Sequence, residues 1–109
     1  MLTRDIAIDV VKGFIIAVQS EGIILQKVIM FGSYAGNKQH EWSDIDLALV
    51  ADDFTGFGFD DKQGFAKINC RKPFSIIHAK TFPTSYFETG DPFIDEIKRT
   101  GIVIYPATA

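Results

Sequence analysis

Cysteine, proline and tryptophan are scarce in this sequence, which contains one cysteine, four prolines and one tryptophan in 109 residues. A single cysteine excludes an internal disulfide, and Cys70 and His78 do not by themselves supply the four ligands of a structural zinc site. The fold must therefore be held by a hydrophobic core. The lack of disulfides is also typical of a reducing compartment, so we expect a cytoplasmic protein.

Positive charge is scarce as well. The formal net charge is −3 and the isoelectric point is about 5.2, so no broad basic surface is available for nucleic acid. This composition argues against a nucleic-acid partner. A polyanionic substrate would have to be bound through a metal ion or a local basic patch.

Long apolar runs are absent. Residues 10–18 are mostly apolar, but Lys12 interrupts them and Asp5 and Asp9 precede them, whereas a secretory signal needs a positive start and an uninterrupted apolar segment. No segment approaches the roughly 20 apolar residues of a membrane span. We therefore expect a soluble protein with no membrane partner.

The apolar residues that are present suffice for one core. Hydrophobic residues make up 47% of the chain and include ten phenylalanines. A chain of this length buries roughly two thirds of its unfolded surface. We expect a single domain over residues 1–109.

The periodicity predicts helices and strands in an order typical of an α+β fold. Thr3 is a candidate cap for a helix over residues 3–20, for which a strand over residues 14–18 is the alternative. The other predicted elements are helices near residues 61–70 and over 92–100, and strands over 24–31, 44–50, 74–79 and 102–105. The prediction is one mixed sheet of three to five strands with helices packed on it.

The segments between these elements are polar or aromatic. Residues 34–43 are expected to form a short helix or turn followed by a loop, with Trp42 covering the core. Residues 52–64 alternate glycine and phenylalanine and predict a loop anchored by aromatic side chains. The phenylalanines of 54–65 and 82–93 are candidates for a surface covered by a partner or by a second copy of the chain.

The most informative stretch links two predicted strands. An apolar run ends at Gly32-Ser33, ten residues follow, and Asp44 and Asp46 then open a second apolar run. Side chains two apart in a strand share a face, so the two carboxylates would stand side by side, with Ile45 on the opposite face. Like charges repel, so this placement favours a cation between them. Two solvated acids at an exposed strand end are the simpler alternative.

The glycine and serine ahead of the acids suit a phosphate group. Gly32 lets the backbone approach a phosphate closely, the N–H groups that follow can hold its oxygens, and Ser33 adds a hydroxyl donor. Asp44 and Asp46 supply the hard oxygen ligands that Mg²⁺ prefers. The stretch therefore predicts a site for a magnesium-bound nucleotide.

These residues and their spacing closely resemble the motif of the DNA polymerase β-like nucleotidyltransferase superfamily. Residues 31–35 and 43–47 are similar to its small prokaryotic members, the minimal nucleotidyltransferases, and residues 91–105 resemble the closing helix and strand of such domains. The resemblance covers most of the chain. It implies the mixed-sheet core of that superfamily.

The resemblance also implies an activity. Members transfer a nucleoside monophosphate from an NTP such as ATP to a hydroxyl group, with Asp44 and Asp46 in the place of catalytic metal ligands. Gly32, Ser33 and Tyr34 are in the place of nucleotide-binding residues. Two Mg²⁺ ions, about 3.5–4 Å apart, would activate the hydroxyl group and neutralise the leaving pyrophosphate.

A protein partner is implied as well. Minimal nucleotidyltransferases often pair with a small all-helical HEPN-type protein in toxin–antitoxin systems, and some of them add AMP to that partner. A hydroxyl acceptor on a protein fits the acidic composition better than an acceptor on a nucleic acid.

The sequence departs from the family pattern in two places. Family members commonly carry Arg-Gly where this chain has Gly36-Asn37, which leaves Lys38 as a candidate phosphate-binding cation. Active members also place a third carboxylate on the strand predicted over 74–79, where this chain offers His78 and no acid. His78 is a candidate catalytic base or metal ligand; the alternative is a histidine that is simply hydrogen-bonded at the strand end.

Two functions therefore remain open. Asp91 or Glu88 could supply the missing carboxylate from a loop, and losing that ligand would impair chemistry more than nucleotide binding. The intact motif favours an active nucleotidyltransferase. The missing acid favours a degenerate module that binds a nucleotide or a partner without turnover.

Overall fold

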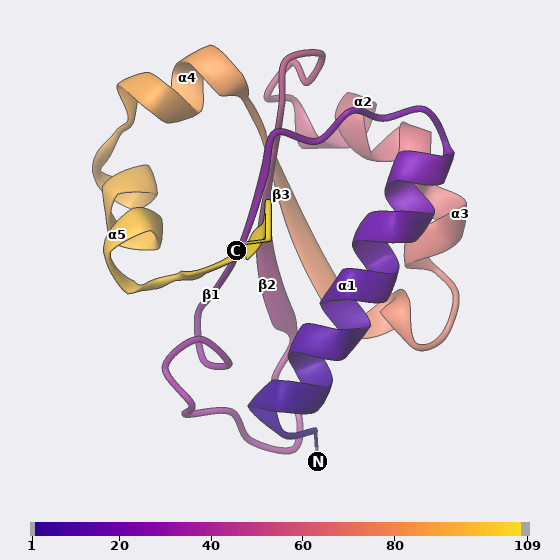
Figure 1. The fold of residues 1–109 in the computed structure, drawn as a ribbon, viewed down its shortest axis with the longest axis vertical. Helices are drawn as coiled ribbons and strands as arrows, with labels where there is room; N and C mark the ends of the chain where they lie inside the picture. The colour runs from indigo at the N-terminus through magenta and orange to yellow at the C-terminus, as the bar shows by residue number, and fades with distance from the viewer. Residues whose placement is uncertain (1, 108–109) are drawn as a thin grey trace.

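A four-stranded mixed sheet forms the centre of the protein in the computed structural model, which describes residues 2–107 (Figure 1). The strand order is β3-β2-β1-β4. Strand β1 (Lys27–Phe31) is antiparallel to both β2 (Ile45–Ala51) and β4 (Ile102–Tyr105), whereas β3 (Ile77–Pro83) is parallel to β2. The α+β fold with a mixed sheet, predicted from the sequence, is confirmed.

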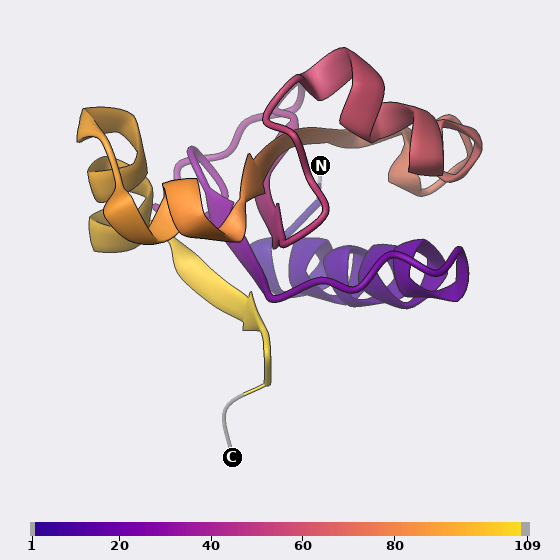
Figure 2. The ribbon, with the colours of Figure 1, turned by 90° about the horizontal axis from the view of Figure 1, so that it is seen from above.

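Helices cover both faces of this sheet (Figure 2). One face carries α1 (Arg4–Ser20), α2 (Gly58–Lys62) and α3 (Ala66–Asn69), with the 3₁₀ turn η1 (Gln63–Phe65) between the last two. The other face carries α4 (Thr84–Thr89) and α5 (Pro92–Thr100). Among the described residues, no helix combines the length and the apolar character needed to cross a membrane.

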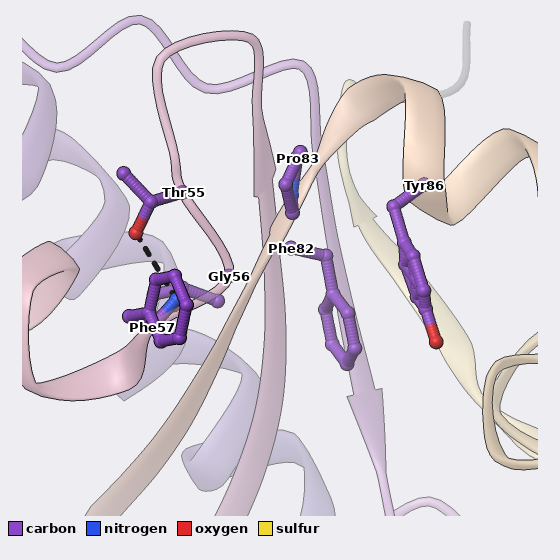
Figure 3. A pocket seen from close by; sticks show the side chains of 7 residues that line it. Thr55, Gly56, Phe57, Phe82, Pro83 and Tyr86 are labelled. Carbon is purple, nitrogen blue, oxygen red and sulfur yellow. Dashed lines mark hydrogen bonds between the residues drawn. The ribbon is translucent and has the colours of Figure 1, made fainter.

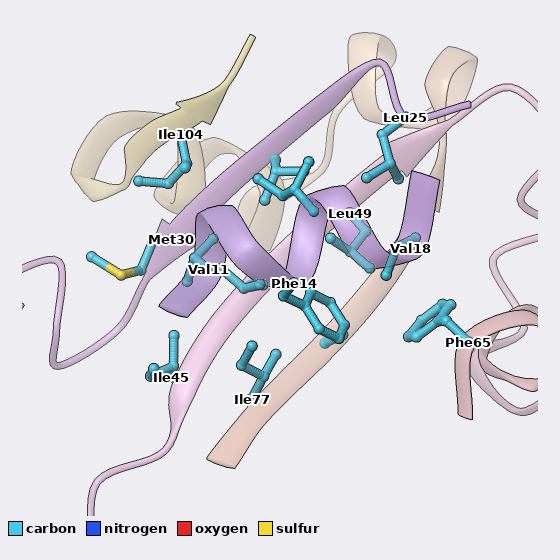
Figure 4. Packing of buried hydrophobic residues seen from close by; sticks show 14 of the residues in the cluster. Val11, Phe14, Val18, Leu25, Met30, Ile45, Leu49, Phe65, Ile77 and Ile104 are labelled. Carbon is cyan, nitrogen blue, oxygen red and sulfur yellow. The ribbon is translucent and has the colours of Figure 1, made fainter. Parts of the chain in front are cut away.

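The larger core lies between α1 and the sheet. Thr3 caps α1 as predicted, its Oγ1 accepting a hydrogen bond from the Ile6 N–H at 3.2 Å, so the alternative strand over 14–18 is wrong. Phe14 is fully buried and meets Phe65 edge-on, with their ring centroids 5.9 Å apart (Figure 4). The smaller core, on the opposite face, consists of Ile29, Ala48, Val50, Phe87, Ile94 and Ile97.

Two predicted strand boundaries are wrong. The strand expected over 24–31 begins only at Lys27. The strand expected over 74–79 is shifted, because residues 74–76 form the 3₁₀ turn η2 and β3 runs from Ile77 to Pro83. Phe74 turns away from the strand to pack on Phe14, with their ring centroids 5.6 Å apart. The packing of Phe74 on Phe14 therefore accompanies a 3₁₀ turn where the apolar residues of the sequence predicted a strand.

Several loop predictions also need correction. Trp42 does not cover the core, since 83% of its surface is exposed. Of the loop phenylalanines, Phe54 and Phe65 are buried anchors but Phe57 and Phe59 are exposed. Helix α4 was not predicted, and the segment 61–70 is divided among three short helical pieces.

Candidate functional site

The two aspartates lie where β2 begins. Asp46 is the second residue of β2 and pairs in register with Phe31 of β1 and with His78 of β3. Asp44 precedes the strand by one residue and is exposed. The opposite face of β2 carries the apolar side chains that pack in the larger core: Ile45, Leu47 and Leu49.

Gly32 follows β1 directly and lies against the carboxylate of Asp46. Its φ of +77° is in the left-handed region, which glycine adopts without strain. A Cβ atom at this position would collide with Oδ2 of Asp46. The glycine is therefore required by its backbone and by the space that the carboxylate fills.

Residues 32–38 form a turn between these two strands. The N–H groups of residues 36–38 close it by donating to the carbonyls of Gly32, Tyr34 and Ser33, at 3.2, 3.2 and 2.8 Å. The N–H groups of residues 33–35 take no part in closing the turn. The Tyr34 side chain is buried in the larger core, so its backbone is the part that a ligand of the turn could contact.

Two cations lie near this turn. Lys38, the candidate from the sequence, is exposed at its end. Arg4 of α1 reaches the turn and donates from Nη1 to the carbonyl of Ala35 at 3.4 Å. Sequence reasoning missed Arg4 because it lies 31 residues from its partner and belongs to no motif.

His78 stands beside Asp46 on the same face of the sheet. Its Nδ1 lies 3.5 Å from Oδ1 of Asp46, and 54% of its side chain is exposed, compared with 30% for the aspartate. Burial raises the pKa of Asp46, and the nearby charge of Asp44 acts in the same direction. His78 and Lys80 lower the pKa only in part. A bound cation would relieve this raised pKa by stabilising the ionised carboxylate.

Lys80 was missed in the sequence because the predicted strand ended at residue 79. In β3 it follows His78 by two residues, so both side chains lie on the face of Asp46. Its Nζ lies 5.8 Å from the ring centroid of Phe93, at the start of α5. Phe93 in turn meets Phe31 edge-on, with their ring centroids 5.7 Å apart. The ammonium group of Lys80 therefore lies near the Asp46 carboxylate, and its charge acts to lower the pKa of that carboxylate.

The donor atoms suit one divalent cation. Two carboxylates are a usual protein contribution to a Mg²⁺ site, in which substrate phosphates and water complete the coordination. Within residues 2–107, no three or more His, Cys, Asp or Glu side chains gather into a metal site. Asp91 does not fill the third position, since it caps α5 through the Ile94 N–H at 2.7 Å and accepts from the Tyr86 hydroxyl.

Comparison with known proteins agrees with this architecture. The chain matches a family model described as polymerase beta, nucleotidyltransferase, over residues 15–108. It is similar to a crystal structure of a toxin–antitoxin with AMP-PNP, with a TM-score of 0.56 and 21% identity over 88% of this chain and 73% of that one. At that identity the likeness concerns the fold. No curated protein matches the chain.

Proposed function

Since the chain belongs to the polymerase β nucleotidyltransferase family, we propose that it transfers a nucleoside monophosphate from an NTP to a hydroxyl group. One observation carries this proposal: the Asp46 carboxylate lies directly against the backbone of Gly32. This contact brings a hard oxygen ligand next to the turn of residues 32–38. A metal-bound triphosphate needs a carboxylate oxygen for the metal ion and backbone N–H groups for the phosphate oxygens.

The proposal assigns a role to each of these residues. Gly32, Ser33 and the backbone of Tyr34 bind phosphate oxygens of the nucleotide. Asp44 and Asp46 would hold Mg²⁺, which when bound would supply positive charge to the triphosphate and to the leaving pyrophosphate. Two ions remain the expectation from the family, and the described residues offer donors for one.

The transfer exchanges one phosphorus–oxygen bond for another. The acceptor oxygen forms a bond to the α-phosphorus, the bond from that phosphorus to the bridging oxygen breaks, and pyrophosphate leaves. His78 accepts the proton of the hydroxyl group. A neutral imidazole that directs its Nδ1–H at Asp46 has Nε2 available for this proton.

A protein partner belongs to this proposal. The crystal structure of similar fold is of a toxin–antitoxin and contains AMP-PNP. We infer an adenine nucleotide and a toxin–antitoxin setting here, with a small helical HEPN-type protein as the partner. Such a pair would act in the cytoplasm, where the exposed Cys70 stays reduced.

A second candidate function has an observation of its own. Strand β3 carries His78 and Lys80 on the site face and no carboxylate. A domain with this strand could bind a nucleotide without transferring it. The two functions differ in turnover and agree on the nucleotide site.

Label transfer separates them. The protein is incubated with Mg²⁺, its genomic neighbour and each of the four NTPs carrying an α-³²P label. An active enzyme attaches label to an acceptor, and the binding module binds nucleotide without transfer.

The nucleotide site itself is tested by a double variant. Asp44→Asn with Asp46→Asn should abolish Mg²⁺-dependent NTP binding, measured by titration calorimetry, because both hard anionic ligands are lost. Asp52→Asn with Asp53→Asn is the matched control, since it removes two exposed carboxylates at the other end of β2. Undiminished binding by the first variant would refute the site.

A further inference from the structure

A groove runs along the outer edge of β3, beginning next to the candidate site. Two hollows, of about 300 and 440 Å³, form it and share Gly56, Thr81 and Phe82. We call it the β3 groove and define it by Gly56, Phe57, Lys62, Lys80, Phe82 and Tyr86. Figure 3 shows β3 passing between the loop that carries Phe57 and the helix that carries Tyr86.

The floor of the groove is an unpaired strand edge. Strand β3 is the last in the sheet order and pairs only with β2. Apart from its pairing with β2, the backbone of β3 between residues 78 and 82 makes no backbone hydrogen bond to the turns and loops of the described residues. Such an edge presents N–H and C=O groups at the spacing of a strand and can pair with another extended segment.

The walls of the groove carry positive charge. Lys62 lies on the α2 side and Lys80 on the α5 side. Neither lysine forms an ion pair with a described residue, although the chain as a whole has a net charge of −3. An occupant with acidic side chains would give both ammonium groups a partner.

Farther along β3 the walls become aromatic. Phe57 is 72% exposed and Tyr86 is 44% exposed. The loop before α2 is nevertheless fixed, because the buried Asp61 carboxylate accepts the N–H groups of Thr55 and Gly56 at 2.8 and 2.9 Å. An exposed ring held on a fixed loop is a feature of interaction surfaces.

We propose that the β3 groove binds an extended acidic segment of a partner protein, which adds to the sheet as a fifth strand. Alternate side chains of such a segment would point to the two walls, where acidic residues meet Lys62 and Lys80 and apolar residues meet Phe57 and Tyr86. The backbone pairs with β3 along residues 78–82.

The position of the groove connects this surface to the proposed transfer, and this part of the inference rests on the proposed function. Neighbouring strands lie about 4.8 Å apart, so a residue opposite His78 would be one strand from His78 and two strands, about 10 Å, from Asp46. A hydroxyl-bearing side chain at that position would be carried to the candidate site. The partner segment would then be the acceptor.

The other sheet edge does not offer the same surface. Strand β4 has four residues, and its pairing with β1 shifts register between Val28 and Ile29. A short, irregular edge is a poor template for strand addition. The β3 edge is longer and has the groove.

The test uses defined peptides and fluorescence anisotropy. The probe is a labelled octapeptide that repeats the unit Glu-Glu-Val-Val, so that each of its two faces carries both glutamate and valine. One comparison peptide replaces glutamate with lysine, and two others carry N-methyl groups on alternate amides, one set for each edge of the peptide. We expect the acidic peptide to bind and the basic one to fail. Only one N-methylated peptide should lose binding, because only one edge pairs with β3.

Charge reversal identifies the groove. Lys62→Glu with Lys80→Glu should weaken binding of the acidic peptide by about 100-fold, at about tenfold for each hydrogen-bonded charge. Lys67→Glu with Lys72→Glu is the matched control, which changes two exposed lysines outside the groove by the same charge and should bind as the wild type does. Far-UV circular dichroism of both variants checks the fold.

The outcomes separate this proposal from the nucleotide site. Asp44→Asn with Asp46→Asn should retain peptide binding even where NTP binding is lost. Amide hydrogen exchange should slow within residues 78–82 when the peptide binds. The proposal would be overturned if the acidic peptide did not bind or if the basic peptide bound equally well. It would also be overturned if the reversed-charge variant bound the acidic peptide as the wild type does and differed only in self-association. In the last case the lysines would serve only to keep the edge from pairing with copies of the chain.

Discussion

At the scale of single residues, Gly32 carries two constraints that can be tested together. Its backbone is left-handed and its Cα is covered by the Asp46 carboxylate. Gly32→Ala should cost about 1–2 kcal/mol for the left-handed conformation and, in addition, displace the carboxylate. We expect NTP affinity in Mg²⁺ to fall by at least about tenfold, which corresponds to about 1.4 kcal/mol of lost binding free energy.

Gly22 provides the matched control for this prediction. It also has a positive φ, of +89°, but a Cβ there would meet nothing within 4 Å. Gly22→Ala should therefore lose similar stability in urea denaturation and keep its NTP affinity. Equal loss of affinity in both variants would show that general destabilisation, and not contact with Asp46, accounts for the effect.

Residues of the candidate site differ in how far the sequence could predict them. Gly32 and the two aspartates come from a motif in which residue type and spacing depend on each other, so a single chain reveals them. Lys80 and Arg4 belong to no motif and reach the site through β3 and α1. Their part in the site depends on strand register and helix packing, which composition and spacing do not encode locally.

At the scale of elements, β3 shows why boundaries are harder to predict than strands. The apolar run beginning at Phe74 reads as one strand, but its first three residues form η2 and only the remainder pairs with β2. The three-residue shift brings Lys80 and Phe82 into the strand. Because Lys80 and Phe82 line the β3 groove and Lys80 also lies near Asp46, this boundary error hid both residues from the sequence analysis.

Asp61 joins three elements and provides a pH-dependent test. It lies in α2, and its carboxylate accepts hydrogen bonds from Thr55 and Gly56 in the preceding loop and from the Thr81 hydroxyl of β3 at 2.7 Å. Burial alone would raise the pKa of Asp61. The hydrogen bonds outweigh burial and leave this pKa below its usual value.

The sign of the linkage follows from this lowered pKa. Asp61 binds a proton more weakly in the folded state than in the unfolded state, so it stabilises the fold above the unfolded pKa, near 4. That stability is lost as the pH falls through the folded pKa. Asp61→Asn should cost about 2–4 kcal/mol at pH 7, since hydrogen bonds to a charged group are worth about 1.5–3 kcal/mol each.

Urea denaturation between pH 7 and pH 2.5 measures both effects. The difference between wild type and Asp61→Asn should be largest at pH 7 and shrink toward the acid end. Asp60→Asn is the control, because its side chain is exposed beside Asp61 and is expected to change stability by less than about 0.5 kcal/mol. A difference that does not depend on pH would exclude the ionised Asp61 carboxylate as the stabilising group.

At the scale of the whole molecule, the class of fold was predictable because it rests on broad features. Alternating helical and strand periods over most of the chain give an α+β sheet, and no single boundary error changes that result. The helix α4 escaped prediction because it is six residues long and polar on its surface. Its position is set by Phe87, which packs on Phe82 with their ring centroids 5.5 Å apart.

The sheet is shared by two cores, which leads to a prediction about cooperativity. Phe14 belongs to the core on the α1 face and Ile97 to the core on the α5 face, and both are almost fully buried. Phe14→Ala should cost about 3–5 kcal/mol and Ile97→Ala about 2–5 kcal/mol. Strands β1 and β2 each contribute side chains to both cores. Loss of either core should therefore unfold the other as well.

This prediction is a test of the single domain expected from the sequence. Methyl NMR signals of Val11 and Ile94 report on the two faces during urea denaturation. In the wild type and in each variant, both signals should disappear at one urea concentration, which should be lower in the variants. If Ile97→Ala lost the Ile94 signal while the Val11 signal kept its wild-type midpoint, α4 and α5 would form a separately unfolding unit. In that case the residues of α5 that border the site, Phe93 above all, could open and close over it without disturbing the larger core.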